Sequence, residues 1–71
     1  MNRQKVEQAI LNKLRDGKPQ DVIDLWNTLK ANKKLSEVVF AIVLDGLEQA
    51  GFIERVSLNA GIFVKLASSL N

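Results

Sequence analysis

The 71-residue sequence predicts an α+β domain in which three helices are followed by a two-stranded β-hairpin. Apolar residues recur with helical spacing in three successive segments, and after Gly51 the pattern changes to runs rich in β-branched and aromatic residues. A chain of this length has room for one core, and 46% hydrophobic with 25% charged residues is typical of a globular protein. We therefore expect residues 1–71 to form a single domain.

The first helix is expected over about residues 2–16. Its stripe has the spacing i, i+3, i+4, i+7, i+8 and consists of Val6, Ala9, Ile10, Lys13 and Leu14. Gly17 is suited to the left-handed conformation that ends a helix, and Pro19 cannot continue the hydrogen-bond ladder. The helix is therefore predicted to stop before Gly17.

The second helix is expected over about residues 21–31. Asp21 is a good N-cap, and Asp24 favours the positive end of the helix dipole. One face carries Val22, Leu25, Trp26 and Leu29. Asn32, in the break that follows, suits the tight turn before the next helix.

The third helix is expected over about residues 36–50, with Ser36 as its cap and Gly51 as its end. The two strands are expected at about 52–58 and 62–66, with Asn59, Ala60 and Gly61 forming the turn between them. The chain thus predicts helix, helix, turn, helix and hairpin in about 66 residues.

This order of elements resembles the winged helix-turn-helix family. The resemblance rests on Asp24-Leu25 and Leu29 in the second helix, on the short turn from Asn32 to Leu35, and on Ser36. Its strongest part is the stretch Leu44-x-x-Leu47 continuing through Glu48-Gln49-Ala50-Gly51 to Arg55, which is similar to the end of a recognition helix leading into a wing strand. The resemblance implies a DNA-binding protein, a transcription regulator or a phage or plasmid accessory factor, whose third helix enters the major groove.

The outer face of the third helix is expected to carry Val38, Ile42, Asp45 and Gln49. Gln49 can hydrogen-bond to a base edge, Val38 and Ile42 can contact thymine methyls, and Asp45 would repel phosphate. The sequence has no Arg or Lys between Ser36 and Glu54, so the usual guanine contact is missing. Three interpretations of this apolar face stay open: it is covered by the N-terminal residues or the tail of the chain, it is covered by a homodimer or a partner protein, or it contacts DNA.

Trp26 has two interpretations. Its neighbours Val22 and Leu29 favour a place in the core, whereas a protruding indole would serve as an interface anchor. The candidate interface residues are therefore Val38, Ile42 and Trp26.

Lysines cluster around the turn before the third helix, and further cations lie at the end of the first helix (Lys13, Arg15, Lys18) and on the strands. Arg55 and Lys65 are expected to share the solvent face of the hairpin. The alternative is that all of these cations form an ordinary solvated surface, and the net charge of +2 is a weak attraction for a polyanion. Four or five phosphate contacts would give a log–log salt slope of about −4. The candidate nucleic-acid contacts are Lys30, Lys33, Lys34, Ser36, Gln49, Arg55 and Lys65.

The composition argues against catalysis. The sequence has no His, Cys or Tyr, which excludes zinc fingers, iron–sulfur clusters, Cys–His nucleophiles and disulfides. The paired Asp21 and Asp24 are better explained as helix caps than as acid and base. We expect no enzyme activity, cofactor, metal or small-molecule substrate. The longest apolar run, Val38 to Leu44, is too short for the roughly 20 residues that span a bilayer, and we expect a cytoplasmic protein.

Overall fold

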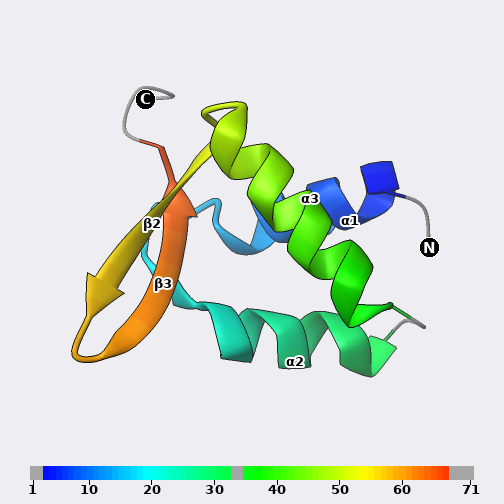
Figure 1. Ribbon diagram of the computed structural model, residues 1–71, viewed down its shortest axis with the longest axis horizontal. Helices are drawn as coiled ribbons and strands as arrows, with labels where there is room; N and C mark the ends of the chain where they lie inside the picture. Colours follow the sequence, from blue (N-terminus) through cyan, green and yellow to red (C-terminus); the bar gives the residue numbers. More distant parts are fainter. Residues whose placement is uncertain (1–2, 33–34, 68–71) are drawn as a thin grey trace.

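The computed structural model describes residues 3–32 and 35–67. Figure 1 shows helix α3 (Glu37–Gln49) in front of α1 (Arg3–Lys13), with α2 (Val22–Asn32) beneath them. A hairpin of β2 (Ile53–Leu58) and β3 (Gly61–Leu66) stands beside the start of α2. Three helices followed by a hairpin is the predicted architecture, and the prediction is confirmed.

The first helix packs as predicted but ends early. Val6, Ile10 and Leu14 are fully buried. The helix stops at Lys13 rather than near residue 16, because the chain tightens into i→i−3 turns in which Leu14 N–H donates to Leu11 O and Gly17 N–H to Leu14 O. Gly17 follows with a φ of +79°, the left-handed conformation expected of it.

The predicted caps of the other two helices are confirmed. Asp21 Oδ1 accepts hydrogen bonds from the backbone N–H groups of Ile23 and Asp24, at 2.8 and 3.3 Å. Ser36 Oγ accepts from Val38 and Val39 at the start of α3. Gly51, with a φ of +85°, lies just beyond the end of α3.

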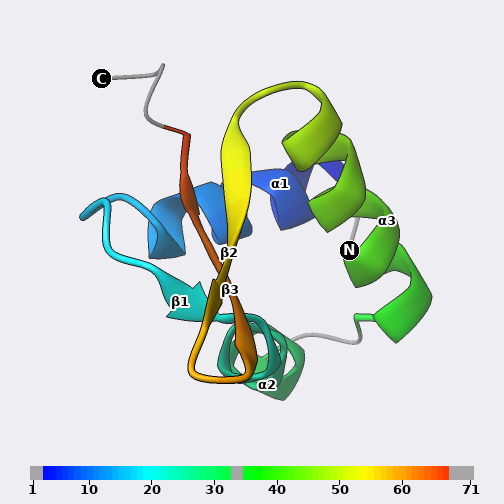
Figure 2. The ribbon, with the colours of Figure 1, turned by 60° about the vertical axis from the view of Figure 1, so that its left-hand side comes forward.

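The sheet has one strand that the sequence did not predict. Strand β1 (Gln20–Asp21) pairs antiparallel with β3, Gln20 opposite Val64, so the strand order is β1-β3-β2. Figure 2 shows β1 meeting the hairpin just before α2 begins. These two residues immediately precede α2. Their pairing fixes the start of α2 against the hairpin.

The hairpin turn is one residue shorter than expected. Asn59 and Ala60 both have positive φ, at 49° and 66°, which is the signature of a two-residue type I′ turn. Gly61 already belongs to β3, where it pairs with Leu58.

One apolar core joins the helices to the sheet. Its members from α3 are Phe40, Val43, Leu44 and Leu47. They pack with the apolar stripes of α1 and α2 and with Ile53 and Val64 of the hairpin. Helix α3 is therefore held along one side, and its opposite side is available for contact.

Candidate nucleic-acid interface

The outer face of α3 is exposed along its whole length. Val38 is 66% and Ile42 45% exposed, and Asp45 and Gln49 are exposed as well. The predicted composition of this face is thereby confirmed. Residues 3–32 and 35–67 leave both Val38 and Ile42 accessible, so the described part of the chain does not cover them. The first two residues and the end of the tail, which belong to that interpretation, lie outside the described residues.

Small residues widen the exposed face. Ala41 and Gly46 are also exposed on α3 and flank the line from Val38 to Gln49. Between Ser36 and Glu54 the sequence has no cation, so every positive charge near this face comes from another element.

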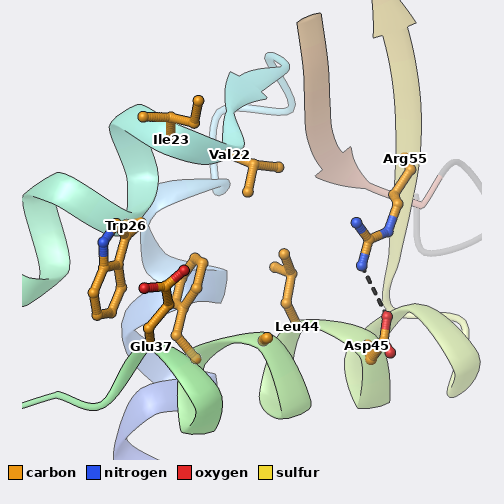
Figure 3. A pocket seen from close by; sticks show the side chains of 9 residues that line it. Val22, Ile23, Trp26, Glu37, Leu44, Asp45 and Arg55 are labelled. Atoms are coloured by element: carbon orange, nitrogen blue, oxygen red, sulfur yellow. Dashed lines mark hydrogen bonds and ion pairs between the residues drawn. The ribbon is translucent and has the colours of Figure 1, made fainter.

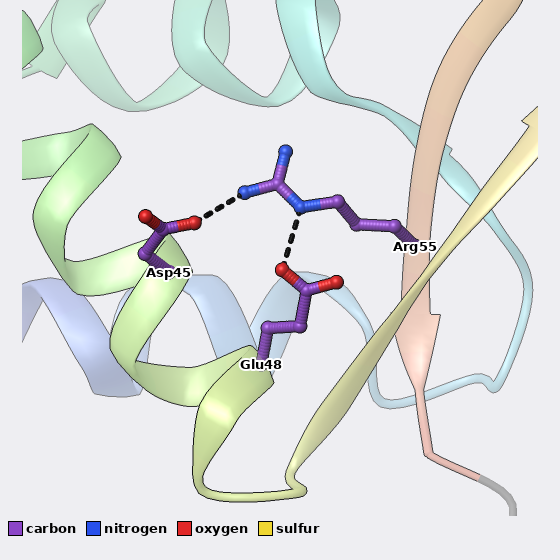
Figure 4. A network of polar contacts seen from close by, with 3 residues as sticks. All are labelled: Asp45, Glu48 and Arg55. Carbon is purple, nitrogen blue, oxygen red and sulfur yellow. Dashed lines mark hydrogen bonds and ion pairs between the residues drawn. The ribbon is translucent and has the colours of Figure 1, made fainter.

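Arg55 of β2 supplies one such charge. Its Nη2 donates to Asp45 Oδ1 and its Nε donates to Glu48 Oε1, both at 2.8 Å (Figure 4). The hydrogen bond to Glu48 is the main reason that the pKa of Arg55 is raised above its ordinary value; partial burial opposes the rise, and attraction by both carboxylates adds to it. Arg55 thus ties the first wing strand to α3.

The expectation that Arg55 and Lys65 share a solvent face is wrong. Arg55 lies opposite Val64, and Lys65 lies opposite Glu54. Because neighbouring residues of a strand point to opposite faces, the two cations lie on opposite sides of the hairpin. Arg55 is on the side that carries buried Ile53 and Val64, whereas Lys65 is ion-paired with Glu54 at 3.4 Å on the other side.

Lys30 lies near the end of α2, close to an aromatic pair. Its Nζ is 5.7 Å from the centre of the Trp26 ring, and Trp26 in turn packs on Phe40 with ring centres 5.3 Å apart. No carboxylate within residues 3–32 or 35–67 pairs with Lys30. The predicted contacts Lys33 and Lys34 lie outside the described residues. Ser36 uses its hydroxyl oxygen as the cap of α3.

Trp26 is half-buried and lines a groove of about 410 Å³ between α2, α3 and β2 (Figure 3). Val22, Ile23 and Arg55 also line a second hollow of about 280 Å³, which reaches Ile62. Ile42 lines a different hollow, of about 190 Å³, with Arg3 and Glu7 of α1. The structure therefore does not bring Trp26 into one patch with Ile42.

Sequence reasoning missed the exposed apolar residues Ile23 and Ile62, which are 68% and 54% exposed. Ile23 falls outside the apolar stripe of the second helix, so its exposure could have been predicted from the sequence. Ile62 alternates with Val64 as a core residue would, so no local signal distinguishes it.

The described residues contain no cluster of three or more His, Cys, Asp or Glu that could hold a metal ion. No helix in the described part of the chain is long and apolar enough to cross a membrane.

Comparison with known proteins supports the fold. No protein-family model matches the chain, and no curated protein matches it. Among solved structures, the crystal structure of SSV1 F-93 is similar, with a TM-score of 0.79 and 22% sequence identity over 90% of this chain and 71% of that chain. The fold of this protein is therefore that of a winged helix.

Proposed function

We propose that this protein binds double-stranded DNA, with the outer face of α3 as the surface that enters the major groove. The observation that carries the proposal is this face itself: in a winged-helix fold, α3 is capped at its start, buried along one side and open along the other. A helix open in this way can enter a groove about 12 Å wide. The role we propose is that of a transcription regulator or a phage or plasmid accessory factor.

The phosphate contacts that we propose come mainly from Lys30, Lys33 and Lys34. Lys30 is exposed and has no carboxylate partner among the described residues. Arg55 and Lys65, in contrast, are both engaged with carboxylates and would have to exchange partners to reach phosphate. Three phosphate contacts would give a log–log salt slope of about −3, slightly shallower than the slope of about −4 expected from four or five contacts.

Catalysis is not part of the proposal. Asp21, one of the two paired carboxylates in the sequence, is occupied as the N-cap of α2. The sequence has no His or Cys to act as a general base or nucleophile near neutral pH. We therefore propose a binding protein without cofactor, metal or small-molecule substrate.

The experiment is a fluorescence-anisotropy titration of a labelled mixed-sequence duplex at several salt concentrations. We expect binding that weakens with a slope near −3, and we expect the double variant Lys33→Glu, Lys34→Glu to lose it. The matched control is Lys13→Glu, Arg15→Glu, which makes the same charge change at exposed positions in and after α1. No binding by the unmodified protein at low salt would reject the proposal, and equal losses in both double variants would reject the lysine turn as the contact.

A second candidate function is protein interaction, including pairing of two copies of this chain. The observation that favours it is the exposure of Val38 and Ile42. Full burial of one such side chain in an interface would stabilise a complex by about 1.5–3 kcal/mol. Both functions claim the same face of α3. A dimer that also binds DNA would have to pair through only part of that face and contact phosphates with its basic residues.

A further inference from the structure

Asp45 lies near the middle of the outer face of α3 and is held in place by another element. Its side chain is 64% exposed, yet its Oδ1 accepts a hydrogen bond from Arg55 Nη2 at 2.8 Å. Arg55 is itself fixed at a second point, because its Nε donates to Glu48 Oε1 (Figure 4). Two anchor points fix the planar guanidinium, so the carboxylate of Asp45 is oriented before any ligand arrives.

The same pairing changes the electrostatic character of α3. A lone carboxylate on this face would repel DNA phosphates. The guanidinium of Arg55 offsets one of the two negative charges of Asp45 and Glu48. Within residues 3–32 and 35–67 only Arg55 bonds to the carboxylate of Asp45, through Oδ1, so Oδ2 is available to an outside donor.

We propose that Asp45 is a specificity-determining residue that accepts a hydrogen bond from the N4 amino group of a cytosine in the major groove, and that Arg55 is its positioning residue. This inference rests on the proposed DNA-binding function and deepens it. A carboxylate can only accept, and cytosine presents an amino donor in the major groove, whereas guanine presents two acceptors. Adenine places an acceptor, N7, beside its amino group, which disfavours a carboxylate.

The neighbours of Asp45 complete the expected pattern. Gln49 follows four residues later on the same face, about 6 Å further along the helix, and its amide suits adenine. Val38 and Ile42 present methyl groups that suit thymine. We do not assign the base contact to Glu48. Its side chain is 36% exposed, less than that of Asp45, and it accepts a hydrogen bond from Arg55 Nε on the side of α3 that faces β2. The preferred site is therefore expected to contain a cytosine near an adenine, in a context rich in thymine.

The test is selection of bound sequences from a randomised duplex library, with the unmodified protein and with Asp45→Asn. We expect the unmodified protein to enrich one C·G pair, and Asp45→Asn to weaken that single preference on the order of tenfold or more while leaving the other positions unchanged. The matched control is Asp24→Asn, which removes the same charge from an exposed position on α2. We expect this control to raise overall affinity at low salt and to keep the preference for cytosine.

Arg55→Gln separates a positioning role from a merely structural one. We expect it to weaken the preference at the same base pair, and to have no further effect at that pair in the Asp45→Asn background. A structural role would instead weaken all positions together. An enriched site that Asp45→Asn reproduces unchanged overturns this inference and leaves DNA binding standing, as does retention of duplex by the unmodified protein without enrichment of any base pair. Failure of the unmodified protein to retain any duplex, even at low salt, rejects both.

Discussion

At the scale of single residues, Arg55 shows how a side chain's role depends on what it meets in the fold. Its position in the sequence is that of a cation on a wing strand, suited to phosphate. In the structure it bridges Asp45 and Glu48 on α3, ten and seven residues earlier in the chain. Its pairing with Val64 across the hairpin puts it on the side that faces α3. Arg55 consequently links β2 to α3, and its guanidinium is already engaged when a ligand arrives.

Arg55→Gln should lower the free energy of unfolding by up to about 1 kcal/mol at low salt, because exposed ion pairs contribute about 0.2–1 kcal/mol each and two carboxylates would be left facing each other. The loss should shrink in about 1 M salt, where the Debye length falls to about 3 Å. Urea denaturation at both salt concentrations measures it. The control is Lys65→Gln, which removes the ion pair with Glu54 on the other face. A loss that does not depend on salt would contradict the ion-pair account.

The protonation of Arg55 adds no pH dependence near neutrality. Its pKa is raised in the folded state, so its contribution is fully present below the pKa of the unfolded chain and is lost only as strongly alkaline solution deprotonates it.

At the scale of elements, the hairpin turn carries a conformational cost. Ala60 has a φ of 66° in a type I′ turn that favours glycine at this position. An L-residue with a Cβ pays roughly 1–2 kcal/mol in the left-handed region. The Asn59-Ala60 turn is therefore less stable than an Asn-Gly turn of the same type would be.

Ala60→Gly should raise the free energy of unfolding by about 1 kcal/mol, since the relief of backbone strain exceeds the entropy that glycine loses on folding. For a chain of this size the midpoint of thermal unfolding should rise by about 4–8 °C. The matched control is Ala41→Gly at an exposed position within α3, where the same substitution should cost about 1 kcal/mol. If both variants lose stability, the turn is not strained as described.

The elements themselves were predictable from local signals. Short stretches of sequence are enough to predict the apolar stripes of the helices, the caps Asp21 and Ser36, and the glycines that end helices. The structure confirms these features. Strand β1 was not predictable, because its two residues become a strand only by pairing with β3 more than 40 residues later. The same holds for the Arg55 pairs and for the groove beside Trp26, which depend on how the hairpin meets α3.

At the scale of the whole molecule, exposed apolar side chains lie on α3 and around the hairpin. Val38 and Ile42 are exposed on one side of α3, and Ile23 and Ile62 are exposed near the hairpin. Exposed apolar side chains that gather in patches mark interaction sites. The first pair shares its face with Asp45 and Gln49, so a partner there would compete with DNA.

Ile42→Asp should convert a dimer into a folded monomer, because a charge in a buried interface lacks a partner. Sedimentation equilibrium measures the mass, and circular dichroism checks the fold. Ile62→Asp is the matched control: it places the same charge at an exposed isoleucine outside α3 and should leave self-association unchanged. A native protein that sediments as a monomer at high concentration would refute the dimer.

NMR mapping tests directly whether the outer face of α3 contacts DNA, as we propose. Backbone amide signals of the isotope-labelled protein would be followed as a short duplex is added at low salt. We expect the largest shifts on Val38, Ile42, Asp45 and Gln49, with smaller shifts near Lys30 and on β2. Shifts confined to α1, or no shifts at saturating duplex, would contradict it, and the apolar face of α3 would then be assigned to a protein partner.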